Sequence, residues 1–198
     1  MTATLKRQIT RTDILPIDDY ARERKSLREG VVAAKKRRRV EVGPVATFYF
    51  ENYQTMWHQV HEMLFIEKGG EAQIADELAA FNPLIPQGSE LVATMMLEIP
   101  DPVVRAATLA KLGHIERYIF FEIDGARIAA VAETDVERTK EDGKTSSVHF
   151  LRFPFSAGQI AAFRKEGARV VLGLDHPEYG HMAILPEPVR AALAGDFA

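Results

Sequence analysis

Cysteine is absent from this chain of 198 residues. Its absence excludes disulfides, a thiol nucleophile, thiolate-bound zinc and an iron–sulfur cluster held by the chain's own cysteines. No hydrophobic run approaches the roughly 20 apolar residues that a membrane-spanning helix needs. The first residues, Met1 to Arg11, are basic and lack the apolar core of a signal peptide. We therefore expect a cytoplasmic protein without a membrane segment, in which redox chemistry needs a borrowed cofactor or a metal held by His and carboxylates.

Several common fingerprints are missing as well. The chain contains no G-x-G-x-x-G, G-x-x-x-x-G-K-[ST] or G-x-S-x-G motif, so the usual dinucleotide, P-loop and α/β-hydrolase signatures are absent. The residues that are present, 46% hydrophobic and 27% charged, are typical of a packed globular protein. Their charge is uneven: residues 1–40 hold 12 Lys and Arg against 5 Asp and Glu, whereas the remainder is acidic.

Helical and strand patterns alternate along the chain, and turn residues separate them. A helix over residues 17–39 is expected to break or kink near Ser26 or Gly30. Asp124-Gly125 predicts a tight hairpin turn, and Ser156 with Gln159 predicts a helix cap. Further helices are predicted over 53–67, 71–81, 101–112, 156–166 and after Pro186, and strands over 40–42, 45–50, 91–99, 118–123, 127–132, 148–155 and 169–174.

From residue 89 onward this order resembles a split β-α-β arrangement of ferredoxin-like type with one added strand. The predicted class is α+β, with a mainly antiparallel sheet and an N-terminal helical and hairpin region. We expect a single domain, 1–198, with candidate sub-lobes 1–88 and 89–198 that meet at a Pro-rich connector. The charged segment Glu133 to Ser146 is either an exposed connector or a flap; Thr134 with Glu137 is a candidate capping box in it.

One candidate metal site lies in the helix over 53–67. His58, His61 and Glu62 share a helical face and are residue types that bind metals. His58 and Glu62 lie nearly opposite the apolar stripe, so a metal there would need cover from another element. The alternative is a solvated pair of His58 and Glu62 on an exposed face.

A second constellation lies in the strand over 148–155. Both faces of this strand are apolar apart from His149 on one and Arg152 on the other. A buried guanidinium needs a partner, and Glu98, Glu122 and Asp175 are candidates near strand ends. We expect a buried ion pair of Arg152 with one of these carboxylates, beside a histidine that either is hydrogen-bonded in the core or binds a metal.

The polar segment after the last predicted strand, from Asp175 to His181, is the third candidate. Asp175 and His176, joined by His149 and by His61 or Glu62, could bind iron, manganese or zinc. The alternative for this segment is ordinary turn chemistry.

A basic run ends the first predicted helix. Its members could contact an acidic protein, phosphates or anionic lipid. No aromatic residues interleave with them, which disfavours a single-strand nucleic-acid platform. The run consists of Lys35, Lys36, Arg37, Arg38 and Arg39.

Five segments together resemble a bacterial family known as domain of unknown function 3501. They are Lys35–Arg39, Glu62–Leu64, Asn82–Pro86, Thr145–Phe153 and Asp175–Pro177. The resemblance implies no catalytic residues. It implies a genomic context, because genes of this family often lie beside those of rubrerythrin-like and iron–sulfur proteins.

The leading hypothesis is therefore a cytoplasmic accessory protein of an iron-dependent redox or peroxide-stress system, whose basic helix end docks an acidic partner. The first alternative is an enzyme or sensor with one metal ion held by His and carboxylates. The second is a nucleic-acid-binding protein. The sequence leaves homo-oligomerisation open.

Overall fold

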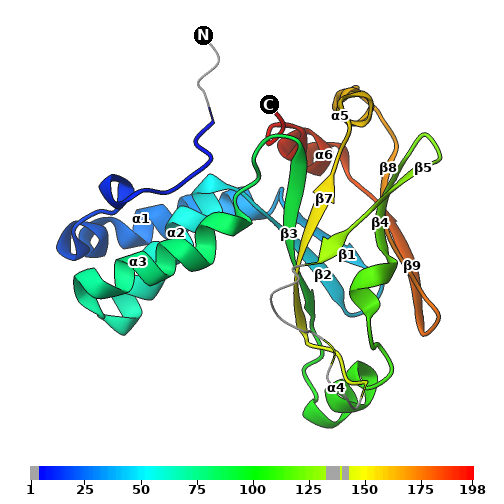
Figure 1. Ribbon diagram of the computed structural model, residues 1–198, viewed down its shortest axis with the longest axis horizontal. Coiled ribbons are helices and arrows are strands. Elements are labelled where there is room, and N and C mark those ends of the chain that lie inside the picture. The colour runs from blue at the N-terminus through cyan, green and yellow to red at the C-terminus, as the bar shows by residue number, and fades with distance from the viewer. Residues whose placement is uncertain (1–4, 133–138, 140–142) are drawn as a thin grey trace.

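A computed structural model describes residues 5–132, 139 and 143–198 of the chain. Most of the charged segment 133–146, including the predicted capping box of Thr134 and Glu137, lies outside the described residues. Two β-sheets face each other, and a layer of three helices extends from one side of them (Figure 1).

The larger sheet has the strand order β1-β2-β3-β7-β6 and the smaller sheet the order β5-β4-β8-β9. Every strand pairing in both sheets is antiparallel. The strands are β1 (Arg39–Val42), β2 (Ala46–Glu51), β3 (Glu90–Leu97), β4 (Ile119–Ile123), β5 (Ala126–Ala129), β6 (Val131–Ala132), β7 (Val148–Pro154), β8 (Val170–His176) and β9 (Tyr179–Ile184).

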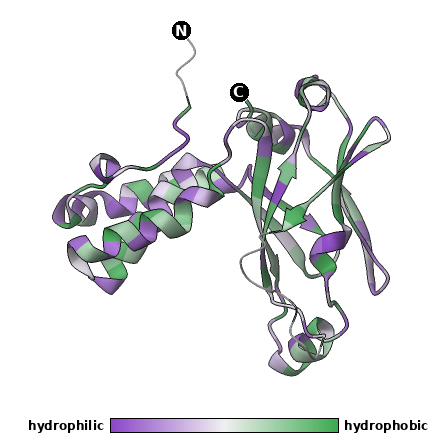
Figure 2. Cartoon of the chain, in the orientation of Figure 1, coloured by the Kyte–Doolittle hydropathy of each residue, from purple (hydrophilic) through white to green (hydrophobic). Residues whose placement is uncertain are grey.

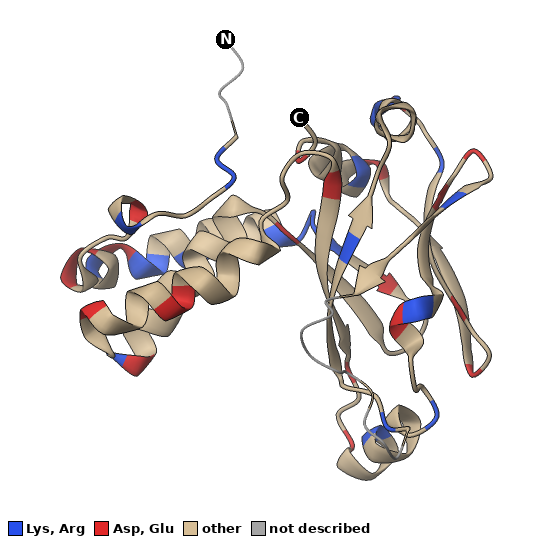
Figure 3. Cartoon of the chain, in the orientation of Figure 1, with Lys and Arg blue, Asp and Glu red and all other residues tan. Residues whose placement is uncertain are grey.

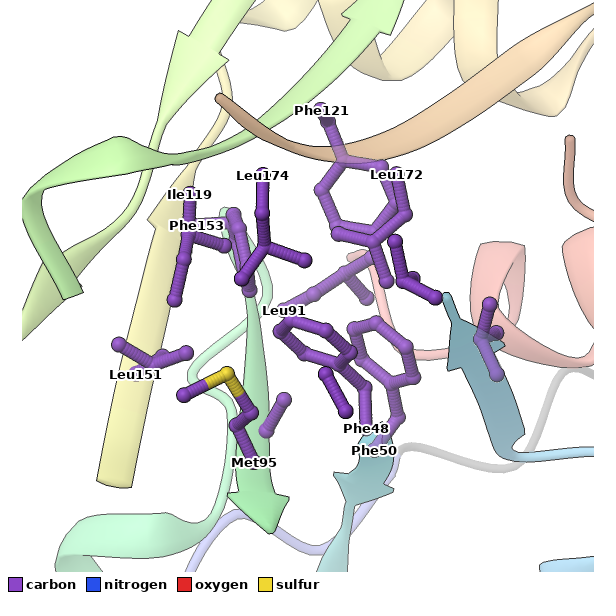
Figure 4. Packing of buried hydrophobic residues seen from close by; sticks show 14 of the residues in the cluster. Phe48, Phe50, Leu91, Met95, Ile119, Phe121, Leu151, Phe153, Leu172 and Leu174 are labelled. Carbon is purple, nitrogen blue, oxygen red and sulfur yellow. The ribbon is translucent and has the colours of Figure 1, made fainter. Parts of the chain in front are cut away.

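The main hydrophobic core fills the space between the two sheets. Phe48 of β2 pairs with Met95 of β3, and Leu91 of β3 pairs with Phe153 of β7. Their side chains meet those of the opposite sheet, such as Phe121 of β4 (Figure 4). Period-two alternation of apolar residues on both sheets therefore produces a sheet-on-sheet core.

The α+β class and the antiparallel pairing are confirmed, whereas the connectivity differs from the ferredoxin-like expectation. The strands expected in one sheet divide between two, and the chain crosses from the smaller to the larger sheet at Ala130, between β5 and β6. The helices between them explain this difference. α4 (Pro102–Leu109) and α5 (Ala157–Arg164) bury one residue each, Leu109 and Phe163. Since they cannot cover a sheet face, the sheets cover each other.

The three N-terminal helices form the projecting layer, with α2 between α1 and α3. A second apolar cluster joins α2 and α3 to the segment that precedes α1, and Val92 of β3 connects it to the larger sheet. α6 lies near the C-terminus beside α5, while α4 lies at the opposite end of the sheets (Figure 1). The helices are α1 (Ile17–Lys35), α2 (Tyr53–Glu67), α3 (Gly70–Phe81) and α6 (Glu187–Ala194), with short 3-10 turns η1 (Arg11–Asp13), η2 (Asn82–Leu84) and η3 (Ile115–Tyr118).

Local sequence signals locate most turns and caps correctly. Asp101 accepts hydrogen bonds from the first turn of α4, and Ser156 with Gln159 forms the predicted capping box. Asp124 and Gly125 both have positive φ, 50° and 79°, as a tight hairpin turn requires. The first helix differs, because α1 is unbroken and ends at Lys35.

The segment after β8 is a strand rather than a polar loop. β8 extends to His176, a two-residue turn follows, and β9 returns antiparallel to β8. β9 is an edge strand that exposes most of its side chains, so its apolar signal is weak. Its first residue is Tyr179. The Tyr179 hydroxyl accepts hydrogen bonds from the N–H groups of Val45 and Ala46 in the β1–β2 hairpin, each at 3.1 Å.

The hairpin β1–β2 belongs to residues 1–88, yet it pairs with β3 of the second candidate sub-lobe. The two candidate sub-lobes thus share one sheet. Within the described part of the chain, no helix combines the length and the apolar character needed to cross a membrane.

Candidate functional site

The face of α2 that carries Glu62 is covered by α1. Arg24 of α1 donates two hydrogen bonds to the Glu62 carboxylate, at 2.8 and 2.7 Å, and the Tyr20 hydroxyl donates a third at 2.6 Å. The bonds from Arg24, and to a lesser extent the bond from Tyr20, lower the pKa of Glu62 to about 2. The predicted solvated pair with His58 is therefore wrong: Glu62 instead anchors α1 on α2.

The imidazole of His61 connects α2 to the segment that precedes α1, and both of its nitrogens are bonded. Its Nδ1 lies 2.7 Å from the Trp57 carbonyl oxygen, and its Nε2 accepts a hydrogen bond of 3.0 Å from Leu15 N–H. These two bonds require the neutral tautomer with the proton on Nδ1. Burial lowers the pKa of His61 and also that of His58, which is 9% exposed. The imidazole of His61 is thus structural, whereas Nε2 of His58 is buried without a hydrogen-bond partner among the described residues.

The predicted metal ligands of the sheet region lie on different sheets. His149 is on β7, with Nε2 2.9 Å from the Ser146 carbonyl oxygen. His176 is on β8, with Nε2 3.2 Å from the Gly113 carbonyl oxygen, while its Nδ1 accepts from Glu178 N–H. Asp175 accepts a 2.6 Å hydrogen bond from Arg127.

No three His, Asp or Glu side chains within residues 5–132, 139 and 143–198 are grouped to hold a metal ion. The structure therefore does not bring His149, Asp175, His176, His61 and Glu62 together. β7 and β8 are consecutive strands along the chain, and the sequence alone could not show that they belong to opposite sheets.

Arg152 does not pair with the predicted carboxylates. Its guanidinium lies 3.5 Å from Glu90 of the neighbouring strand β3 and donates to the Pro83 carbonyl oxygen. Glu98 accepts from Thr47 and Tyr49 instead. Glu122 lies 3.7 Å from Arg127. The side chain of Arg152 is about one-third exposed, because it lies on the outer face of the larger sheet.

The basic run divides into residues of different roles. Lys36 and Arg37 are exposed and Lys35 is half-buried. Arg38 is buried, bonded to Asp196 and to the carbonyl oxygens of Phe50 and Glu51. Arg39 pairs with Glu41 on the same strand. The predicted five-residue docking run is therefore reduced to Lys35, Lys36 and Arg37, because Arg38 and Arg39 form ion pairs within the protein at the start of β1.

A groove on the outer side of α1 places further cations beside Lys36. It has a volume of about 650 Å³, and Phe65 of α2 contributes to its lining. Lys25, Arg28 and Lys36 line it without an ion pair to any described residue, whereas Arg24, which also lines it, is bonded to Glu62. Figure 3 shows how Lys and Arg recur along α1 and at its junction with the sheets. We call this surface the basic groove.

An apolar pocket of about 540 Å³ adjoins the basic groove, and the two share Ala21 and Phe65. It lies between the start of α1, the end of α2 and the start of α3. Hydrophobic and hydrophilic residues interleave on these helices, in contrast to the more continuously hydrophobic β3 (Figure 2). Most of its lining is apolar: Ile14, Leu15, Pro16, Ile17, Ala21, Leu64, Phe65 and Ile74.

Most of this surface lies outside the predicted docking run, because its cations are not consecutive in the sequence. Lys25, Arg28, Val32 and Lys36 recur at intervals of three or four residues, which places them on one helical stripe. That periodicity was readable, but the partnership of α1 with Phe65, which lies 40 residues beyond Lys25, depends on tertiary packing.

Comparison with known proteins agrees with this fold. The chain matches the family described as "Protein of unknown function (DUF3501)" over residues 8–197. It is also similar to a solved structure, a novel protein of unknown function from Burkholderia pseudomallei K96243. The two are 40% identical with a TM-score of 0.89, over 96% of this chain and 100% of the other. No curated protein matches the chain significantly. The chain belongs to the DUF3501 family.

Proposed function

We propose that this protein is an accessory protein that binds an acidic partner protein through the basic groove. The observation that carries the proposal is the unpaired state of three groove cations, Lys25, Arg28 and Lys36, among the described residues. Lys35 and Arg37 extend the same charge toward the sheets. The family resemblance supports the choice of partner, an iron-dependent redox or peroxide-stress protein.

Electrostatics favour this kind of partner. The chain as a whole is acidic, with a net charge of −3, so the cations of α1 form a local positive surface on a negative molecule. Such a surface steers an acidic protein into one orientation and speeds its association at low ionic strength. The protein's own acidic regions repel the same partner elsewhere.

A nucleic acid fits the basic groove less well. Single strands bind best where exposed aromatic rings stack on bases. The Phe65 ring at the groove is already covered by the Arg24 guanidinium, 4.7 Å from the ring centroid. The groove therefore offers positive charge without a free stacking surface.

The test is affinity capture from an extract of the protein's own cells at low salt, with quantitative identification of the bound proteins. Wild type is compared with the charge reversal Lys25→Glu, Arg28→Glu, Lys36→Glu. A matched control, Arg22→Glu, Lys165→Glu, Arg169→Glu, changes net charge equally at exposed positions outside the groove.

We expect wild type and control to capture an acidic iron-dependent redox protein, and the groove variant to lose it. Capture that survives groove reversal, or that never includes a redox protein, overturns the proposal. Capture of nucleic acid in place of protein, lost as salt rises, supports the nucleic-acid alternative instead.

A further inference from the structure

The basic groove and the apolar pocket form one continuous surface along α1, because Ala21 and Phe65 line both. We infer that the acidic partner binds there as an amphipathic helix, with apolar side chains in the pocket and carboxylates facing the cations of the groove. This inference rests on the proposed function and names the structural class of its partner.

The exposure of α1 supports a partner of this shape. Only Tyr20 and Val31 are buried among its 19 residues, whereas Ile17 and Val32 are 44% and 50% exposed. Ile17 lines the apolar pocket and Val32 the basic groove. An amphipathic helix in a groove is recognised in this way, by a few apolar anchors flanked by charge pairs.

The dimensions suit a helix of ordinary length. Residues 17–36, which contribute to both pockets, cover about 30 Å at 1.5 Å per residue. A partner helix of about five turns matches that length. Its apolar anchors are expected at one end, over Ile14, Ile17 and Ile74, and its carboxylates at the other, over Arg28 and Lys36.

Charge argues against a second copy of this chain as the occupant. If two α1 helices packed antiparallel about the middle of the surface, Lys25 and Arg28 of each copy would face the same residues of the other. Like charges in contact are repulsive. An acidic helix of another protein instead pairs with Lys25, Arg28 and Lys36, which outnumber Glu29, the one carboxylate in the described groove lining.

Two charged residues that line the apolar pocket, Arg11 and Glu71, form an ion pair with each other. Arg11 donates to both carboxylate oxygens of Glu71, at 2.5 and 2.7 Å. This ion pair is satisfied within the pocket lining, so it does not compete with the cations of the groove for a partner's carboxylates.

Three synthetic peptides of 18 residues provide the probe. The first has Leu at helical spacing in its first half and Glu on the same face of its second half. The second has the same composition in scrambled order, and the third has Lys in place of every Glu. Binding to the full chain is followed by fluorescence anisotropy, helix formation by circular dichroism, and location by amide chemical shifts.

The variant Ala21→Lys separates the inference from simple charge attraction. It adds a cation to the surface and obstructs the junction of groove and pocket. If the partner is anchored in the pocket, affinity for the first peptide falls about tenfold. If only charge matters, affinity rises. The matched control Arg22→Ala lies outside both pockets and is expected to leave affinity within about twofold.

The inference stands if the first peptide binds at least tenfold tighter than the scrambled one, becomes helical, and shifts the amides of Ala21 and Phe65. Equal binding of both acidic peptides, abolished by the triple groove reversal, overturns the helical inference and leaves acidic docking intact. Absence of binding by either acidic peptide, or preference for the basic peptide, overturns the helical inference, whereas the proposed acidic docking is overturned only if the capture experiment fails as well. Self-association that buries Ala21 and excludes the peptides identifies a second copy as the occupant and overturns the inference as well.

Discussion

The guanidinium of Arg38 is bonded to the carboxylate of Asp196, 158 residues further along the chain, and both side chains are buried. This ion pair joins the end of the first helical segment to the C-terminus. Two neighbouring bonds tighten the same junction: Arg7 donates to the Asp196 carbonyl oxygen at 2.7 Å, and Ala198 N–H donates to the Gly88 carbonyl oxygen at 2.9 Å. The C-terminal residues therefore stabilise the fold, and Arg38 is not available to a partner.

Replacing either member of this ion pair leaves a buried charge without its partner. Arg38→Ala or Asp196→Ala is expected to lower the free energy of unfolding by about 3–5 kcal/mol. The double variant Arg38→Met, Asp196→Leu should cost less than the sum of the single changes, because no charge stays buried. Urea unfolding at constant pH measures all three. Additive effects in the double variant would contradict direct coupling of the two groups.

Acid is expected to loosen α1 through Glu62. The pKa of this carboxyl is about 2 in the folded chain, against an ordinary value of 4.5. A lowered pKa stabilises the fold above pH 4.5, and that contribution is lost as pH falls toward 2. Glu62→Gln should cost about 1–2 kcal/mol at pH 7 and almost nothing near pH 2. Unfolding curves across this range test it, with exposed Glu29→Gln as the control.

A second pH dependence comes from His61 at higher pH. Burial lowers its pKa below the ordinary 6.5, so the neutral ring stabilises the fold above pH 6.5 and that contribution is lost as pH falls further. Protonation of Nε2 removes the acceptor of Leu15 N–H. Hydrogen exchange of the Leu15 amide, corrected for its intrinsic rate, should therefore show less protection at pH 5.5 than at pH 7.5.

His61→Gln is expected to flatten this pH dependence, whereas His114→Gln, which changes a half-exposed imidazole, should leave it unchanged. The pKa of His58 is lowered in the same direction by burial, so a slope that remains in His61→Gln is compared with that of the double variant His58→Gln, His61→Gln. An unchanged slope in His61→Gln would show that this ring does not control the Leu15 contact.

Tyr179 connects β9 to the β1–β2 turn through its hydroxyl. It donates to the Val42 carbonyl oxygen at 2.8 Å and accepts from two N–H groups of the turn. Tyr179→Phe removes all three of these hydrogen bonds and should cost about 1–3 kcal/mol in thermal or urea unfolding. Met182→Ala changes an exposed side chain of the same strand that forms no hydrogen bond to the turn, so a similar loss there would contradict this explanation.

Metal analysis tests the alternative hypothesis that His149 and His176 bind a metal ion. Both nitrogens of His176 are bonded to main-chain groups. We therefore expect protein purified without chelator to contain substoichiometric iron, manganese and zinc, unchanged in His149→Ala and His176→Ala. Stoichiometric metal that either substitution removes would restore the metal hypothesis and show that these residues move together on binding.

The connection between β1 and β2 illustrates what the sequence itself determined. Gly43 has φ of +71°, and a Cβ at this position would lie 2.5 Å from the His181 ring. The sequence places two strands on either side of this bend, over 40–42 and 45–50, because turn residues such as Gly43 and Pro44 act locally. The same holds for the Ser156 cap, the Asp124-Gly125 turn, and α2, which begins at Tyr53 and ends at Glu67 as predicted.

Only the tertiary structure decided which of these elements meet. The alternation of β7 revealed two apolar faces but not that Glu90, rather than Glu98 or Glu122, lies beside Arg152. Likewise, five consecutive cations indicated a docking run, yet Arg38 is buried with Asp196. Local periodicity and turn chemistry depend on neighbours within a few residues, whereas sheet partnership, helix cover and ion pairing depend on contacts across more than one hundred residues in some cases. The proposed groove, formed by α1 against Phe65, belongs to this second class.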